Sequence, residues 1–256
     1  MSESNRPNIV IQTRGLSVVY DRNRVLANIN MELTQGSIYG VIGPNGAGKS
    51  TLFKAILGLI EDYVGEVKVF GGEAQQHRKR VAYVPQKDEV DWSFPASVRD
   101  VVEMGRYPHK SVFQRLSSND RAITQKAMEE LGIADLADRQ IGMLSGGQQQ
   151  RVFIARALCQ EAELMLMDEP FVGVDKNSEE HIIRVLKDQA KQGKTLLVVH
   201  HDLATVHHYF DKLIMINHNL IALGPTEEVF TPANLARCFG GQLSILHQIS
   251  QGNFAK

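Results

Sequence analysis

The chain has 256 residues, a net charge of −1 at neutral pH and 43% hydrophobic residues. This length provides a full hydrophobic core, either as one large domain or as a core with an inserted subdomain. The balanced charge gives no sign of a nucleic-acid-binding surface. The apolar runs are too short to span a membrane, and the polar start, MSESNRPN, lacks the apolar stretch of a signal peptide. The sequence therefore predicts a soluble intracellular protein.

The two cysteines, Cys159 and Cys238, lie far apart in the sequence. They suggest neither a disulfide framework nor a metal site, and they suit a reducing compartment. We expect both to be small buried apolar residues.

Short apolar runs separated by turn signals predict antiparallel strands at the start of the chain, at residues 9–13, 16–20 and 25–33. The run SIYGVI, residues 37–42, predicts a buried strand. Further along the chain, strongly apolar runs alternate with helical segments. Strands that alternate with helices predict a parallel sheet with helices on its faces.

One helical segment begins at Ser118. Its apolar residues Ile123, Ala127 and Leu131 recur at four-residue spacing, and Gly132 marks the expected end.

The stretch GPNGAGKST, residues 43–51, follows the buried strand and precedes an apolar helical pattern. It matches the pattern G-x-x-x-x-G-K-[ST] of a phosphate-binding loop. Its glycines let successive N–H groups turn toward an anion, and the helix that begins near Lys49 adds the positive end of its dipole. Lys49 can reach the outer phosphates, and the Ser50 hydroxyl is a ligand for Mg²⁺. The predicted ligand is a nucleoside triphosphate.

Three apolar runs end at residues suited to phosphate chemistry. SIYGVI ends at the phosphate loop, LMLM ends at Asp168 and Glu169, and TLLVV ends at His200 and His201. In open α/β sheets, ligands bind beyond the carboxyl ends of the strands, so we expect these groups to face one site.

Asp168 and Glu169 have separate predicted duties. Asp168 can hold the Mg²⁺ that bridges the outer phosphates, directly or through water. Glu169 can polarise the water that attacks the γ-phosphate. His201 can hydrogen-bond the γ-phosphate, although a histidine in this place could also simply end a strand.

The stretch LSGGQQQR, residues 144–151, predicts a second anion site. Ser145 and Gln148 have the spacing of a capping box in front of an apolar helix face. Together with the N–H groups of Gly146 and Gly147, Ser145 would form an anion-binding helix start. A chain with one phosphate loop needs such a site if two copies meet across a dimer.

The motifs GPNGAGKST, LSGGQ, LMLMDE and HHD, in this order, resemble those of the ATP-binding-cassette (ABC) ATPases. The resemblance extends to about Pro232. It implies an α/β fold: a P-loop NTPase core with a mainly parallel sheet, an N-terminal antiparallel β subdomain and an inserted α-helical subdomain. On this basis we expect a single ABC ATPase domain over residues 1–256, with the core at 8–86 and 161–232, the helical subdomain at 87–160 and a C-terminal tail at 233–256.

The resemblance also implies roles for individual residues. The catalytic residues are Glu169 and His201, and the Mg²⁺ ligands are Ser50, Gln86 and Asp168. The ATP-binding residues are Tyr20, whose ring stacks on adenine, and Gly43, Pro44, Asn45, Gly46, Ala47, Gly48, Lys49, Ser50 and Thr51. The family forms a head-to-tail homodimer with two ATP molecules between the subunits. The residues that act across it are Ser145, Gly146, Gly147, Gln148 and Asp175.

The chain carries one cassette and no membrane segment, an arrangement similar to importers with a separate permease pair and an extracytoplasmic binding protein. Residues 90–109, VDWSFPASVRDVVEMGRYPH, resemble the ATPases of manganese, zinc and iron uptake systems. The resemblance implies the ATP-hydrolysing subunit of such an importer, peripheral on the cytoplasmic face of the inner membrane, with no nucleic-acid partner. The alternatives are an iron-chelate or cobalamin importer and a soluble ABC ATPase of iron–sulfur cluster assembly.

Two further features carry open alternatives. Trp92 and Phe94 are either core aromatics or contacts to the permease, which the family docks near Pro95. The four histidines in HHDLATVHHYF suggest a regulatory metal site as one hypothesis. The alternative is ordinary surface histidines on a helix, because the ATPase need not touch the cargo.

Overall fold

The structure is a computed structural model that describes residues 8–111 and 113–240. The chain divides into two compact units. The first unit contains residues up to His77 and from Leu197 onward, and the second contains Arg78–Leu196.

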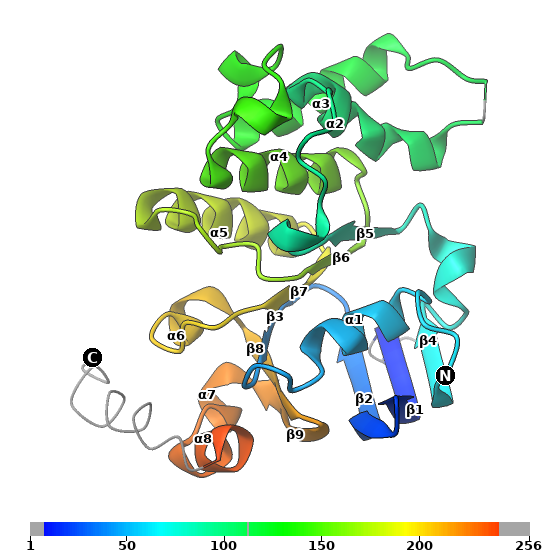
Figure 1. The fold of residues 1–256 in the computed structure, drawn as a ribbon, viewed down its shortest axis with the longest axis vertical. Helices are drawn as coiled ribbons and strands as arrows, with labels where there is room; N and C mark the ends of the chain where they lie inside the picture. Colours follow the sequence, from blue (N-terminus) through cyan, green and yellow to red (C-terminus); the bar gives the residue numbers. More distant parts are fainter. Residues whose placement is uncertain (1–7, 112, 241–256) are drawn as a thin grey trace, which may run out of the picture. The chain divides into compact units, whose positions relative to one another are not determined.

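The first unit holds two groups of strands with short helices (Figure 1). The strands are β1 Ile9–Tyr20, β2 Asn23–Thr34, β3 Ile38–Ile42, β4 Val64–Val69, β8 Lys212–Asn217 and β9 Asn219–Pro225. The helices are α1 Lys49–Ile56, η1 Ala74–His77, α6 Val206–Tyr209, α7 Thr226–Val229 and α8 Pro232–Phe239.

β1 pairs with β2 and β4 in an antiparallel sheet with the order β2-β1-β4. The prediction of separate strands at 9–13 and 16–20 is wrong, because both runs belong to β1. The register shifts between Thr13 and Leu16, but side chains satisfy the backbone there. Asn30 Oδ1 accepts from the Gly15 N–H at 2.8 Å, and Ser17 Oγ accepts from the Asn28 N–H at 2.9 Å. The strand therefore continues through an irregularity that resembles a turn in the sequence.

β3 pairs with β8 in parallel, from Tyr39 opposite Lys212 to Ile42 opposite Met215. β9 then pairs with β8 in the antiparallel direction. All five residues of β3 are buried. This burial is typical of a strand in a parallel sheet, which is covered on both faces.

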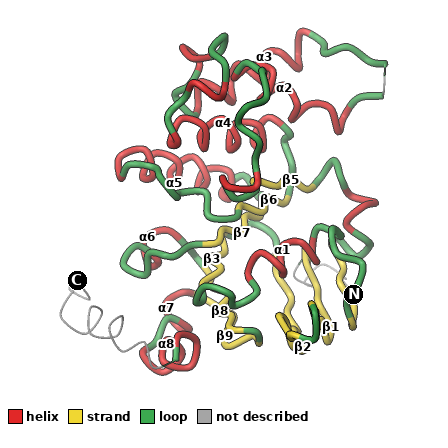
Figure 2. The backbone as a smooth tube through the Cα atoms, in the orientation of Figure 1, coloured by secondary structure: helices red, strands yellow, loops and turns green. Residues whose placement is uncertain are grey.

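The second unit is mostly helical, as the red segments around α2, α3, α4 and α5 in Figure 2 show. Its strands are β5 Val81–Val84 and β6 Leu164–Met167, which pair in parallel. Its helices are η2 Lys87–Glu89, α2 Val98–Glu103, η3 Met104–His109, α3 Ser118–Glu130, η4 Ala134–Leu136, η5 Ile141–Met143, α4 Gly146–Cys159 and α5 Lys176–Lys191.

α2, α3 and α4 pack against one another in this unit. The helix expected from Ser118 is confirmed as α3, which ends at Glu130, just before Gly132. Its first turn carries a capping box between Ser117 and Asp120, and α2 begins with a capping box between Ser97 and Asp100. These reciprocal hydrogen bonds satisfy N–H groups that a helix start leaves without a partner in the helix.

β7, Thr195–Val199, carries the chain from the second unit back to the first. At its start the Thr195 N–H donates to the Glu163 carbonyl at 2.8 Å, within the second unit. Beyond its end the His200 N–H donates to the Val41 carbonyl at 3.1 Å, within the first. Mainly parallel strands, an antiparallel sheet and helices together make the α/β fold that the sequence predicts.

Both cysteines are buried free thiols, as predicted. Burial raises the pKa of the Cys238 thiol to about 11. Within residues 8–111 and 113–240, none of the helices combines the length and the apolar character needed to cross a membrane.

Candidate nucleotide site

The predicted phosphate loop occupies the turn between β3 and α1. Two of its glycines are required by the local geometry. A Cβ on Gly43 would lie 2.0 Å from the Ile216 carbonyl oxygen, and Gly48, the residue before α1, has φ +94°. Only glycine adopts the second conformation without strain, and only glycine fits against β8 at the first position. The loop backbone is therefore fixed in a turn that directs the chain into a helix N-terminus.

Lys49 is the first residue of α1 and is buried. Its Nζ donates to the carbonyls of Gly43 and Pro44, both at 2.9 Å, so the ammonium group lies within the turn of the loop. Ser50 and Thr51 follow in the first turn of the helix, where backbone N–H groups and the helix dipole favour an anion. The loop can thus hold phosphate oxygens by charge and by backbone donors.

The turn between β8 and β9 supports the phosphate loop. Sequence patterns do not predict this contact. The His218 N–H donates to the Ala47 carbonyl at 3.0 Å, and the His218 carbonyl accepts from the Ala27 N–H at 2.7 Å. His218 Nδ1 also lies 3.1 Å from the Val25 carbonyl. The motif Asn-His-Asn signals a turn, but only the fold brings that turn to the loop.

The two adjacent histidines have different environments. His200 is buried, whereas His201 is exposed. Because the His200 N–H is bonded to the Val41 carbonyl, the segment that carries His201 starts beside the end of β3, which leads directly into the phosphate loop. The expectation that the ends of these two strands lie together is confirmed within the first unit.

In the second unit, Asp168 and Glu169 directly follow β6, and both accept from Gln86. Gln86 Nε2 lies 3.3 Å from Asp168 Oδ1 and 3.2 Å from Glu169 Oε1. Asp168 is completely buried. A buried carboxylate is stable only beside donors or cations, and two carboxylates with an amide are the oxygen ligands that Mg²⁺ prefers. The residues predicted to bind Mg²⁺ in this unit are therefore adjacent and chemically suited to it.

Glu169 has an unusual backbone conformation, with φ +54°. Side-chain-bearing residues adopt this left-handed region at a cost of about 1 kcal/mol or more, and such strain is concentrated at functional sites. The conformation sets the direction of the Glu169 side chain directly after a buried strand. Phe70 and Glu161 also have a positive φ, so the role of Glu169 stays a prediction.

The capping box predicted in LSGGQ is confirmed at the start of α4. Ser145 Oγ accepts from the Gln148 N–H at 3.3 Å, and Gln148 Oε1 accepts from the Ser145 N–H at 2.9 Å. A Cβ on Gly147 would lie 3.5 Å from the Gly173 carbonyl. The start of this helix thus lies close to the loop that leads to Asp175.

Asp175 is itself the N-cap of α5, where its Oδ1 accepts from the Ser178 N–H at 3.0 Å. The hydrogen bonds from Ser178 lower the pKa of the Asp175 carboxyl. Tyr20, in the first unit, is the last residue of β1 and is exposed, so its ring is accessible for stacking. The roles of both residues toward a partner or a nucleotide stay predictions.

Trp92 and Phe94 differ in the structure. Trp92 is half-buried: its Nε1 donates to the Lys87 carbonyl at 2.9 Å, and its ring meets Phe153 edge-on at 5.3 Å. Phe94 is 58% exposed. The interpretation as a core aromatic therefore fits Trp92, and the interpretation as a contact to the permease fits Phe94.

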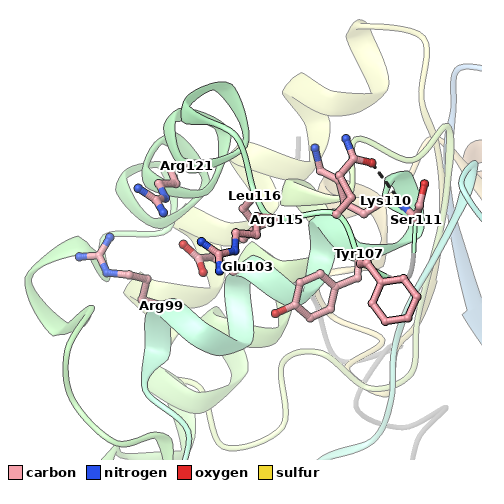
Figure 3. A pocket seen from close by; sticks show the side chains of 10 residues that line it. Arg99, Glu103, Tyr107, Lys110, Ser111, Arg115, Leu116 and Arg121 are labelled. Carbon is pink, nitrogen blue, oxygen red and sulfur yellow. Dashed lines mark hydrogen bonds between the residues drawn. The ribbon is translucent and has the colours of Figure 1, made fainter.

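An open groove of about 980 Å³ lies on the surface of the second unit (Figure 3). Four cationic side chains and one carboxylate, Glu103, line it. Figure 3 shows Arg99 and Arg121 on one side, and Tyr107 and Lys110 on the other. The cationic residues are Arg99, Lys110, Arg115 and Arg121. Phe113, which also lines the groove, is 97% exposed.

Two of the four histidines of HHDLATVHHYF pack against aromatic rings. His200 packs against aromatic rings, and the His207 ring meets Phe230 edge-on at 4.9 Å. Among the residues that the structure describes, no group of three or more His, Cys, Asp or Glu side chains is arranged to hold a metal ion.

Known proteins resemble this chain closely. The sequence pattern of the ABC transporter family matches residues 26–172. The manganese transport system ATP-binding protein MntB of Halalkalibacterium halodurans is 49% identical over 93% of this chain and 94% of its own length. The zinc transport system ATP-binding protein TroB of Treponema pallidum is 48% identical over 95% of this chain and 92% of its own.

Solved structures agree with these sequence relatives. A metal-chelate type ABC transporter in an inward-facing conformation has a TM-score of 0.79 at 31% identity, covering 90% of this chain and 88% of that chain. An ATP-binding cassette of an ABC transporter in its ADP conformation has a TM-score of 0.77 at 26% identity, covering 91% of this chain and 99% of that one. The chain therefore belongs to the ABC transporter family, as one of its ATP-binding ATPases.

Proposed function

We propose that this chain is the ATP-hydrolysing subunit of a binding-protein-dependent importer for a transition-metal ion, such as manganese, zinc or iron. The observation that carries the proposal is the 49% and 48% identity to ATP-binding proteins of manganese and zinc transport systems, over more than nine-tenths of the chain. The metal-chelate type transporter is less similar, at 31% identity. A metal ion is therefore favoured over a metal chelate as the cargo.

The residues of the two units have separate proposed roles toward ATP. In the first unit, Gly43–Thr51 holds the phosphates, Tyr20 stacks on the adenine and His201 bonds the γ-phosphate. In the second unit, Glu169 orients the attacking water and accepts its proton.

Mg²⁺ has a proposed ligand set in Ser50, Gln86 and Asp168. The adjacency of Gln86 and the buried Asp168 supports it. When bound with ATP, Mg²⁺ supplies positive charge to the outer phosphate oxygens.

We propose that two copies of the chain act as a head-to-tail homodimer. The capped start of α4, formed by Ser145, Gly146, Gly147 and Gln148, would contact ATP held by the other copy, and Asp175 would contact that copy. The N–H groups of Gly146 and Gly147, together with the helix dipole, suit the γ-phosphate. ATP binding would close the dimer and hydrolysis would reopen it, because ATP favours the closed state by its contacts with both copies.

The membrane partner in this proposal is a pair of permease subunits, served by an extracytoplasmic metal-binding protein, with the ATPase on the cytoplasmic face of the membrane. We propose that the helical residues 87–160 face the permease. The exposed Phe94 and the groove with Arg115 and Arg121 support this, because cations beside exposed aromatics suit a permease segment that carries carboxylates and apolar residues.

Charge reversal tests this surface. Arg115→Glu with Arg121→Glu should reduce co-purification with the permease, whereas Lys126→Glu, an exposed charge reversal on α3, should not. Equal recovery of the permease with both variants would exclude the groove from the contact.

Metal uptake by cells tests the function as a whole. Cells lacking the chain should accumulate less manganese, zinc or iron, and the wild-type chain should restore uptake whereas Lys49→Ala should not. Lys126→Ala, which removes an exposed lysine, is the control for expression. Unchanged content of all three metals, or recovery of the chain only in soluble complexes, would overturn the importer proposal.

A further inference from the structure

His200 connects the segment that carries His201 to the body of the first unit. Its N–H donates to the Val41 carbonyl at 3.1 Å, and its imidazole Nε2 lies 2.7 Å from Thr205 Oγ1. The ring also packs edge-on against Phe210, with ring centroids 5.2 Å apart. One buried side chain therefore connects both ends of the loop from 200 to 205.

Thr205 Oγ1 has a second neighbour in the turn, because it also lies 3.1 Å from the Asp202 carbonyl. A hydroxyl can donate to or accept from an imidazole nitrogen, so the bond between His200 and Thr205 forms with either ring tautomer. Burial lowers the pKa of His200 to about 4, so the ring is neutral at pH 7.

Further hydrogen bonds lie within the same loop. The Ala204 N–H donates to Asp202 Oδ1 at 2.9 Å, and the Thr205 N–H lies 3.4 Å from the Asp202 carbonyl. The residues between the anchors at His200 and Thr205 thus form a closed turn with His201 exposed on it. A shift at Thr205 would loosen this turn and move His201.

We propose that His200 is a positioning residue, which acts through its hydrogen bond to Thr205 to hold His201 in place for ATP hydrolysis. The inference rests on the catalytic role proposed for His201. His200 itself would not touch the nucleotide. A catalytic group displaced by about 1 Å can lose roughly a hundredfold in rate. Loss of one anchor of a turn with several bonds should cost less, about tenfold in kcat.

A matched pair at Thr205 tests the proposal with the full chain assembled with its permease. Thr205→Val keeps the shape but removes the hydroxyl, and Thr205→Ser keeps the hydroxyl. We expect kcat for MgATP to fall about tenfold in Thr205→Val, with KM changed less than twofold, and to stay near wild type in Thr205→Ser. A second pair, His200→Leu and His200→Gln, should repeat the contrast, because the Gln amide also offers a polar group that can bond the hydroxyl.

The effect must also depend on His201. In a His201→Ala background, Thr205→Val should cause no further loss of kcat, since there is no imidazole left to position. The same tenfold loss in that background, or wild-type kcat in both Thr205→Val and His200→Leu, would overturn the inference while leaving the role of His201 intact. Wild-type kcat in His201→Ala alone would overturn the role of His201, and this inference with it.

Discussion

Arg106 and Asp120 form an ion pair in the interior of the second unit. Arg106 Nε donates to Asp120 Oδ1 at 3.0 Å, and both side chains are less than one-tenth exposed. Lys110 contacts the other oxygen of the same carboxylate, and the N–H and hydroxyl of Ser117 donate to it as well. Asp120 thus connects η3 to the first turn of α3, beside the groove. Lys110 and Ser117 are the main reason that the pKa of the Asp120 carboxyl lies well below its usual range.

Asp120→Asn should destabilise the protein by about 2 kcal/mol, because it removes the buried charge that Arg106 and Lys110 share, while Arg106 keeps its contact with Glu161. Since the folded-state pKa of Asp120 is lowered from an unfolded value of about 3.9, its stabilisation is fully present above pH ~4. It is lost as the pH falls toward the folded-state pKa. Urea unfolding from pH 7 to pH 3 would measure both effects.

The matched control is Asp138→Asn. Asp138 lies 3.5 Å from Arg99 but is 91% exposed, so its removal should change stability by less than about 1 kcal/mol. Equal losses in the two variants would show that burial of Asp120 adds nothing to its ion pairs.

Phe94→Ser and Trp92→Ser should have different effects. Phe94→Ser should leave the melting temperature and the basal ATPase rate unchanged and weaken co-purification with the permease, because Phe94 is exposed. Trp92→Ser should lower the melting temperature, because it removes the contact with Phe153 and the bond to the Lys87 carbonyl. Calorimetry and affinity capture separate the two outcomes, and a permease contact unaffected by Phe94→Ser would remove Phe94 from the interface.

Lys49→Ala should weaken binding of ATP roughly tenfold to a hundredfold, the range for loss of hydrogen bonds to a charged group. The variant removes the ammonium group from the turn of the loop but leaves Gly43 and Gly48 to fix its backbone. Titration with a fluorescent ATP analogue would measure the affinity, with Lys126→Ala as the control. Wild-type affinity in Lys49→Ala would contradict the assignment of the loop.

Sequence patterns predicted the elements whose determinants are local. The phosphate loop, the capping box at Ser145 and the helix α3 each follow from residues a few positions apart. The continuity of β1 could not be predicted, because it depends on Asn30 and Asn28 in the neighbouring strand.

Several parts of the candidate site also depend on distant residues. The support of the phosphate loop by His218 requires the pairing of β8 with β3, and the burial of His200 requires Phe210 and Val41. Neither relationship has a sequence period or motif. The left-handed backbone of Glu169 is likewise visible only in the structure, since a glutamate gives no sequence signal for it.

The dimer proposal has its own test in a background that cannot hydrolyse ATP. In Glu169→Gln, addition of Ser145→Arg should abolish the ATP-dependent dimer, because a bulky side chain would block the start of α4. Ser145→Ala, which removes only the cap, should weaken the dimer less. Size-exclusion chromatography with MgATP would compare the variants, and an unaffected dimer in Ser145→Arg would place the interface elsewhere.

Glu169→Gln tests whether the two carboxylates after β6 have separate roles, Glu169 in hydrolysis and Asp168 in Mg²⁺ binding. The amide oxygen of Gln can still accept from Gln86, so the local geometry should persist, and Asp168 and Ser50 remain for Mg²⁺. Loss of a general base typically lowers the rate about a hundredfold to ten-thousandfold. The variant should therefore bind ATP with near-normal affinity and hydrolyse it at least about a hundredfold more slowly, as phosphate release would measure. Asp168→Asn should instead weaken Mg²⁺-dependent binding. Normal turnover in Glu169→Gln would transfer the role of base to His201 or another group.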